Sequence, residues 1–325
     1  IGHAPIGVSG DHYHKADESM FSIRYSNMQM KENSLHGKSI SDQEIIMSQV
    51  NPFASMSGAP AYLSVVPKKM EMQMMMIGGM YAFSDDLTYM GMLMFTKNKM
   101  TSKTYKGAMD RAYLGSFQTS LDDLSNFSFS ALYRLAEINS NRWHLELGID
   151  KSIGKNDNQD LMLTPMNAYM KMIMPYSMQM DESTRLIFGL TNSRNLGSLV
   201  FGSQIKKYTV IEDKDWAFGD KLEISSWLQK AYDNTLSYSV RVLFTKEQNL
   251  SGSSLKIRSP VQSANPLNYG GSTLELGLGA NKIFNFFEKE HIRFGIEYLF
   301  SLNNNKNGLQ MKNDNKFIIG FQFSF

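Results

Sequence analysis

Methionine and histidine are the residues of this chain whose type and spacing could support metal chemistry. The 325 residues include 24 Met and six His. In segments 70–76 and 90–94, Met occupies every second position, so these side chains share one face of an extended strand. The candidate metal ligands of this type are Met28, Met72, Met74, Met76, Met90, Met92 and Met94. Thioether sulfur favours Cu(I) among the common metals, but Met also fills cores and adaptable surfaces.

Three of the six His lie within the first fourteen residues, at His3, His12 and His14. His12 and His14 would share a face of an extended chain, and imidazole binds borderline metals such as Cu(II). If Ile1 is the mature N-terminus, its amine, two backbone nitrogens and His3 could form a square-planar Cu(II) site. A polar terminus without any ligand fits the same pattern. Copper binding is therefore one of several hypotheses.

The elements that would position these side chains are β-strands, because apolar and polar residues alternate through most of the sequence. At the C-terminus, Phe317, Ile319, Phe321, Phe323 and Phe325 point to one side of an extended strand. A last strand of alternating aromatics that ends on Phe is typical of the signal read by the outer-membrane barrel-assembly machinery. The alternative, an edge strand of a soluble sandwich, would aggregate unless it were covered.

The same alternation predicts an all-β protein, a closed antiparallel transmembrane barrel of about twelve strands. The strands centre on 18–30, 68–83, 86–100, 125–136, 141–152, 183–191, 196–210, 218–230, 235–247, 271–284, 290–302 and 317–325. Short connections at 84–86, 137–140, 192–195, 231–234 and 285–289 alternate with long ones at 31–67, 101–124, 153–182, 211–217, 248–270 and 303–315. Short periplasmic turns and long extracellular loops are typical of such barrels. We therefore expect a periplasmic arm or plug over 1–17 and a barrel over 18–325.

Charged residues dominate the strand face opposite to the apolar one, which should face the lumen. The predicted lumen residues are Arg24, Arg134, Arg142, His144, Glu146, Glu223, Arg241, Glu275, Arg293 and Glu297. An unpaired charge in a narrow lumen is costly, so we expect cross-strand ion pairs that either brace the barrel or line a polar path.

Methionine replaces these charges on the first three strands. If Phe83 lies opposite Leu87 across the turn at 84–86, Met80 faces Met90 and Met76 faces Met94. This wall could pack a plug, carry an apolar or aromatic solute, or bind copper.

Composition excludes several classes of protein. No run of 18 uncharged apolar residues is present, which excludes a helical membrane span. The net charge of +2 argues against nucleic-acid binding. The absence of cysteine excludes disulfides and thiol catalysis. No nucleophile motif such as G-x-S-x-G accompanies His144, so we do not expect an enzyme. No signal peptide is visible, and we expect an exported chain to be numbered from its mature form.

The segment 4–15 (APIGVSGDHYHK), which runs into 24–30 (RYSNMQM), resembles a known family. It is similar to poorly characterised outer-membrane "transporter" proteins grouped near the phenol-degradation meta-pathway barrels. Similar blocks recur at 70–74, 163–166, 175–179, 222–227 and 260–271. Tyr13 stands where the corresponding segment of the family usually has Met, so a metal site made only of soft ligands is less favoured there. The resemblance implies a Gram-negative outer-membrane barrel, and implies transport by label alone.

We therefore expect an outer-membrane channel or transporter for a small solute, in contact with lipid and lipopolysaccharide and recognised by the assembly machinery through Phe325. The alternatives are a copper-handling protein and a structural or adhesive surface barrel. Aqueous porins have 16 to 18 strands, so about twelve strands imply a narrow or plugged bore.

Overall fold

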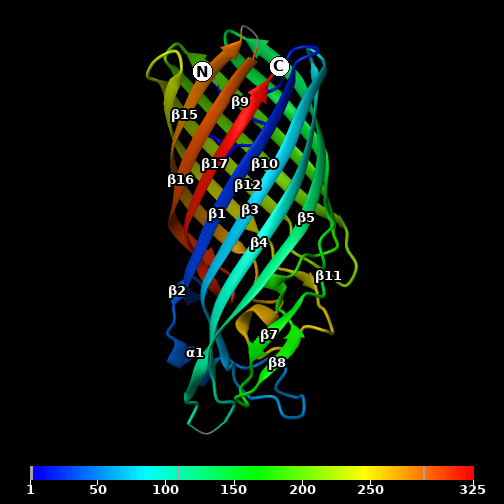
Figure 1. Ribbon diagram of the computed structural model, residues 1–325, viewed down its shortest axis with the longest axis vertical. Helices are drawn as coiled ribbons and strands as arrows, with labels where there is room; N and C mark the ends of the chain where they lie inside the picture. The colour runs from blue at the N-terminus through cyan, green and yellow to red at the C-terminus, as the bar shows by residue number, and fades with distance from the viewer. Residues whose placement is uncertain (1–2, 109, 288–289) are drawn as a thin grey trace.

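The alternating segments form β-strands that pair antiparallel, each with its neighbours in sequence, into a closed barrel (Figure 1). The computed structural model describes residues 3–108, 110–287 and 290–325. Across these residues the barrel consists of β1 (Ser19–Leu35), β3 (Val65–Ser84), β4 (Leu87–Tyr105), β5 (Tyr113–Ile138), β6 (Asn141–Ser152), β9 (Thr184–Leu196), β10 (Leu199–Glu212), β12 (Lys221–Ala231), β13 (Leu236–Glu247), β15 (Gly271–Phe287), β16 (Glu290–Lys306) and β17 (Leu309–Ser324). The predicted fold class is confirmed.

The first and last strands of the barrel, β1 and β17, pair with each other. Ser22 lies opposite Gln322 and Tyr25 lies opposite Ile319 in an antiparallel register. This pairing closes the sheet, so no strand edge of the barrel has to leave its backbone N–H and C=O groups unpaired in lipid.

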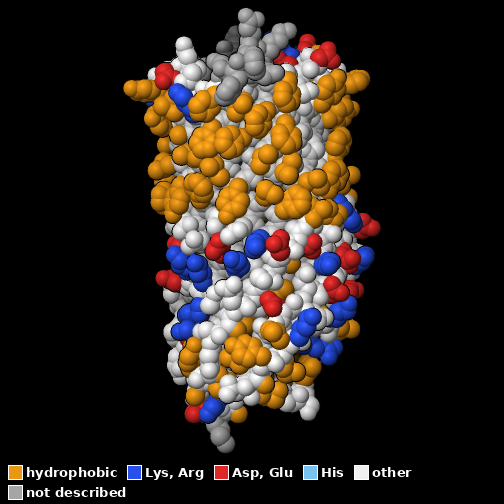
Figure 2. All heavy atoms as spheres, in the orientation of Figure 1, with side chains coloured by type: hydrophobic (Ala, Val, Ile, Leu, Met, Phe, Trp, Pro, Cys, Tyr) orange, Lys and Arg blue, Asp and Glu red, His pale blue; other side chains and the backbone are white. Residues whose placement is uncertain are grey.

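A band of apolar side chains covers the barrel at the end where both termini lie. On β17, Phe317 and Phe321 are 37% and 43% exposed, whereas Ile318 and Gln322, the residues that follow each of them, are 3% and 2% exposed. Figure 2 shows this apolar band over the upper half of the visible face, with Lys, Arg, Asp and Glu beginning directly below it. The band is what the hydrocarbon core of a bilayer requires of the outer face of a barrel.

Several strands continue far beyond this band. β5 has 26 residues, which at roughly 3.3 Å each make it on the order of 85 Å long. Even with a tilt of about 40°, such a strand rises roughly 65 Å, more than twice the height of an apolar band of about 25 Å. The barrel therefore projects well out of the membrane on the side away from the termini.

The long connections gather at this projecting end and contain the remaining short elements (Figure 1). These elements are β2 (Lys38–Ser39), α1 (Asp42–Ser48), β7 (Gln159–Leu163), β8 (Tyr169–Ile173), η1 (Tyr176–Met178), β11 (Trp216–Ala217), β14 (Ser251–Gly252) and η2 (Gln262–Ala264). The helix α1 begins with a capping box, in which Ser41 and Glu44 satisfy each other's backbone N–H groups. The short turns lie at the opposite, periplasmic end. No helix within the described ranges is both long and apolar enough to cross a membrane.

Two of the predicted long loops are instead largely strand. The segment 303–315 forms the ends of β16 and β17, joined by a tight turn at Asn307 and Gly308, and much of 101–124 belongs to β4 and β5. Outside the bilayer neither face of a strand has to be apolar, so the alternation disappears although the backbone pairing continues. The predicted turn at 192–195 is also displaced, because β9 extends to Leu196.

The register between β3 and β4 carries a bulge next to the turn. Ser84, rather than Phe83, lies opposite Leu87, so that predicted pair is wrong by one residue. The bulge absorbs this residue, and beyond it Met80 lies opposite Met90 and Met76 opposite Met94, as predicted.

Candidate functional site

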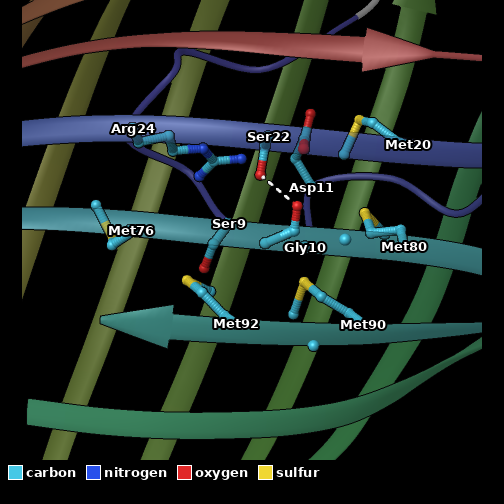
Figure 3. A pocket seen from close by; sticks show the side chains of 13 residues that line it. Ser9, Gly10, Asp11, Met20, Ser22, Arg24, Met76, Met80, Met90 and Met92 are labelled. Carbon is cyan, nitrogen blue, oxygen red and sulfur yellow. Dashed lines mark hydrogen bonds between the residues drawn. The ribbon is translucent and has the colours of Figure 1, made fainter. Parts of the chain in front are cut away.

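The segment of residues 3–14, called the N-terminal segment below, runs inside the barrel at its periplasmic end. Ala4, Ile6 and Val8 are buried. In Figure 3, Ser9 and Asp11 lie beside the inward faces of β1, β3 and β4. The N-terminal segment therefore occupies space that an open pore would need.

Side chains of the barrel wall hold the backbone of the N-terminal segment. Glu297 accepts a hydrogen bond from Gly7 N at 3.1 Å, and Arg24 Nη1 donates to the Val8 carbonyl at 3.1 Å. The wall residues whose side chains bond to carbonyl groups of the segment are Arg24, His144, Gln204, Lys206, Asn281 and Arg293. Much of the charged lumen lining predicted from the sequence thus binds the chain's own N-terminal segment.

Two wall glycines let this segment approach closely. A Cβ atom at Gly295 would lie 2.7 Å from Ile6 Cβ, and one at Gly320 would lie 3.2 Å from Ile6 Cγ1. Only a residue without a side chain leaves room for Ile6 against these two strands.

Two buried ion pairs brace the wall, and each spans one intervening strand. Arg241 on β13 contacts Glu297 on β16 in a bidentate pair, with Nε–Oε1 and Nη2–Oε2 distances of 2.7 and 3.0 Å. The strand between them presents Gly277, where a Cβ would lie 2.7 Å from Glu297 Oε1. Because Gly277 has no side chain, Arg241 and Glu297 can contact each other across β15.

The second pair repeats this arrangement. Lys206 Nζ on β10 lies 2.8 Å from Glu146 Oε2 on β6. Gly189 on β9 is the register partner of both residues. The cross-strand ion pairs expected from the sequence thus exist, and each one passes over a glycine on the intervening strand.

Other predicted lumen residues lie elsewhere. Arg142 is wrong as a lumen residue, since its side chain is 58% exposed and pairs with Glu137 at the periplasmic rim. Arg134 pairs there with Asp86 at 2.6 Å. Both arginines sit next to short turns, where the strands end and no enclosed lumen remains. Glu275 is buried on β15. Glu223 pairs with Lys221 at 3.0 Å near the start of β12, away from the periplasmic turns.

A cavity of about 460 Å³ lies in the lumen beyond the N-terminal segment. One wall carries thioethers, those of Met28, Met72, Met74, Met76, Met92 and Met94. The opposite side carries charged and phenolic groups, those of Asp150, Arg185, Tyr208, Lys221 and Glu247. Lys316 lies beside the methionine wall, as the register partner of Met28. The cavity is large enough for a small organic molecule, because ligand pockets typically enclose roughly 300–1,000 Å³.

An aromatic cluster from the long loops borders the extracellular side of this cavity. Tyr176 and Trp216 pack edge to face with ring centroids 4.8 Å apart, and Phe218 and Tyr269 follow at 5.8 Å. Phe218 and Tyr269 also line the cavity. We call these four residues the aromatic cap. The cavity is thus bounded by the N-terminal segment on the periplasmic side and by the aromatic cap on the extracellular side.

The three N-terminal histidines lie together. The ring centroids of His3 and His12 are 4.7 Å apart, and those of His12 and His14 are 4.8 Å apart. Asp11 Oδ1 lies 2.8 Å from His12 Nδ1. Burial holds the pKa of His3 well below its ordinary value and also lowers that of His14. Burial opposes ionisation of Asp11, but His12 and Arg293 outweigh it and hold the pKa of this carboxyl low.

The histidines and the methionines do not form one site. His3, Asp11 and His12 form a group whose candidate ligand atoms lie within 4.8 Å of one another. Met90 packs with Met20 and Met80, and the six other candidate methionines line the large cavity. Asp11, Met76, Met90 and Met92 line one small gap (Figure 3), and neither His3 nor His12 is among its lining residues. The predicted Cu(II) site at the amine of Ile1 lies outside the described residues.

The comparisons with known proteins agree with this geometry at the level of the fold. No family model matches the chain, and no curated protein matches it in sequence. Among solved structures, the chain is similar to the COG4313 outer membrane channel from Pseudomonas putida F1, with a TM-score of 0.58 and 11% identity over 98% of this chain and 100% of that one. The fold is that of an outer-membrane barrel. The protein, with its apolar band, lies in the bacterial outer membrane.

A second similar structure is the translocator domain of the autotransporter NalP from Neisseria meningitidis. Its TM-score is 0.46 and its identity 11%, over 97% of this chain and 91% of that one. At these identities, the likeness of the outer-membrane barrel to either structure concerns the fold alone.

Several site residues were missed from the sequence. Asp150 and Arg185 lie on the inward parity of predicted strands, so the alternation of Ile149 and Leu186 next to them was a sufficient signal. The aromatic cap had no comparable signal, because its members come from three loops far apart in the chain. Asp11 has no signal in the sequence, because its contacts with Ala4 and His12 depend on how the terminal arm folds.

Proposed function

We propose that the protein is an outer-membrane channel for a small solute that has an apolar or aromatic body and a polar group. The observation that supports this proposal is the cavity of about 460 Å³, which has thioethers on one side and charged groups on the other. Thioethers are polarizable, and their flexible side chains adapt to apolar ligands of different shape. The charged side can orient a polar substituent by hydrogen bonds.

The N-terminal segment and the aromatic cap must both move aside before such a solute can cross the barrel. The segment closes the periplasmic side, and its polar contacts with the wall can exchange for water. The cap closes the other side through packing of Tyr176, Trp216, Phe218 and Tyr269. We infer a gated channel whose conductance is small in the resting state.

Two likenesses support transport of this kind. The similar structure from Pseudomonas putida F1 is described as an outer membrane channel. The sequence blocks described above resemble outer-membrane "transporter" proteins grouped near the phenol-degradation meta-pathway barrels, a likeness that implies transport by label alone. We further propose that lipopolysaccharide surrounds the projecting strands, and that the assembly machinery recognises Phe325, whose side chain is 60% exposed at the end of the chain.

Uptake by liposomes is the deciding experiment. Purified protein, reconstituted into liposomes, should admit small phenols faster than empty liposomes. A variant without residues 3–14 should admit them faster still. Exclusion of a large sugar by both proteins would show that the vesicles are intact. If neither protein gave solute flux or conductance in planar bilayers, the proposed channel function would be refuted.

Copper handling is a second candidate, because six thioethers face one cavity and thioether ligands favour Cu(I). Elemental analysis of protein from copper-fed cells tests it. The matched variant replaces the six methionines that line the cavity, Met28, Met72, Met74, Met76, Met92 and Met94, by Leu. Equal copper content in the two proteins would remove this candidate. A structural or adhesive barrel would instead bind a partner through its loops while the lumen stayed closed to solutes.

A further inference from the structure

The N-terminal segment folds back on itself inside the barrel. Ala4 N donates a hydrogen bond to Asp11 Oδ2 at 2.9 Å, which joins the two arms of a loop. This contact brings His3 on one arm next to His12 on the other. The imidazoles of His3 and His12 and the carboxylate of Asp11 therefore lie close together, although His3 and His12 are nine residues apart in the sequence.

From this juxtaposition we propose that His3, Asp11 and His12 bind a divalent transition-metal ion of borderline softness, Zn(II) or Cu(II), and that the ion fastens the N-terminal segment in its folded form. Imidazole nitrogen and carboxylate oxygen are ligands that both metals accept. The site stands apart from the methionine-lined cavity and does not depend on whether the lumen conducts.

The spacing of the ligand atoms is close to what an ion requires. These atoms lie within 4.8 Å of one another. Two ligands at about 2.1 Å from one ion lie at most about 4.2 Å apart. Three ligands of one tetrahedral ion lie roughly 3.4 Å from one another, so the widest separation has to shorten by up to about 1.4 Å. Rotation about the χ angles of His3 and His12 can supply such a movement.

Unused nitrogen atoms also point to a ligand. His12 Nε2 and His14 Nε2 are both buried and have no hydrogen-bond partner among the described residues. Buried polar atoms are costly when unpaired, so a native structure normally satisfies them. His14, whose ring contacts that of His12, is the candidate for the fourth ligand.

The charges around the group permit a cation. Arg24 and Arg293 are the cations that lie towards Asp11, and both direct guanidinium nitrogens to backbone carbonyls, those of Val8 and Ala4. The carboxylate of Asp11 offsets this positive charge.

Metal titration of the stripped protein tests the site. Full-length protein in detergent is treated with chelator and then titrated with Zn(II) or with Cu(II), each alone, by calorimetry, with elemental analysis after gel filtration. We expect a single ion per chain. His3→Gln, Asp11→Asn and His12→Gln should each weaken binding at least tenfold, because losing only an outer-shell partner of a ligand already costs about 10- to 100-fold in metal affinity.

Two matched variants serve as controls. His36→Gln removes an exposed histidine from a turn at the other end of the barrel, and the six Met→Leu substitutions remove the thioethers. Both should leave binding unchanged. Heat-dependent migration on gels shows that each variant is folded. Unchanged binding in the double variant H3Q/H12Q, or loss of binding only in the methionine variant, would overturn the proposed site.

Hydrogen exchange tests the fastening of the segment. Backbone amides of residues 4–12 should exchange more slowly in the metal-loaded protein than in the stripped protein, and H12Q should remove this difference. If the ion bound but exchange of these amides did not change, the fastening role would be refuted.

Discussion

Gly7→Val should release the N-terminal segment from the wall. A Cβ on Gly7 would lie 2.4 Å from Glu297 Oε2, 2.5 Å from Arg241 Nη2 and 2.7 Å from Ile318 Cδ1. Arg241 and Glu297 cannot move aside without breaking a buried bidentate pair. The segment must move instead, and the hydrogen bond from Gly7 N to Glu297 is lost.

The size of this effect follows from the lost bond. A hydrogen bond to a charged group contributes about 1.5–3 kcal/mol, and about 1.4 kcal/mol corresponds to a factor of ten. The displaced form of the segment should therefore become about ten to a hundred times more populated. The chain has no cysteine, so Val8→Cys, at a position 3% exposed, provides a single reporter thiol.

The rate at which a water-soluble maleimide labels this thiol measures the displaced population. Gly7→Val should raise the initial rate by about ten- to a hundredfold. Gly91→Val is the control, because a Cβ at Gly91 on β4 meets no atom within 4 Å. An equal labelling rate with and without Gly7→Val would refute the conclusion that Gly7 and Glu297 hold the segment.

Three further outcomes are expected. Arg241→Met should lower the free energy of unfolding, measured by urea unfolding in detergent, by about 3–5 kcal/mol, because it leaves Glu297 buried without its partner. Adding Glu297→Leu should restore much of this loss, and no recovery would contradict this account of the pair. Trp216→Ala should raise phenol uptake by liposomes in the variant without residues 3–14 and have little effect with the segment in place, since the two barriers lie in series. Equal gains in both backgrounds would contradict barriers in series, and no gain in either background would place the cap outside the path. Replacing the six cavity-side methionines by Leu should cost less than about 1.5 kcal/mol per site, because the volume is conserved, yet change the selectivity of uptake among phenols; unchanged selectivity would exclude a role of the thioethers in selectivity.

The sequence predicts the membrane-spanning half of the fold well and the projecting half poorly. Within lipid, each strand must alternate, so residues such as Phe317 and Phe321 reveal strand, face and register together. Beyond the bilayer this constraint ends, and the sequence predicts a loop at 303–315 where β16 and β17 form a hairpin. The backbone pairing that forms this hairpin leaves no periodic signal in the side chains.

The candidate site divides in the same way. Arg241 and Glu297 were identified as lumen residues by parity, but their mutual contact depends on Gly277, whose role appears only when the strands are side by side. The contacts of Asp11 with Ala4 and His12 depend on the fold of a segment without regular secondary structure. Alternation carries no information about such a segment.

The two buried ion pairs that cross over a glycine belong to the barrel wall and not to the N-terminal segment. Arg241–Glu297 and Lys206–Glu146 join wall strands to one another, so neither pair loses a partner when the N-terminal segment withdraws. What withdrawal exposes is a set of ready hydrogen-bonding groups, including the Glu297 carboxylate and the Arg24 guanidinium, that water or a passing solute can use at once. The barrel wall can therefore keep its shape through repeated opening and closing.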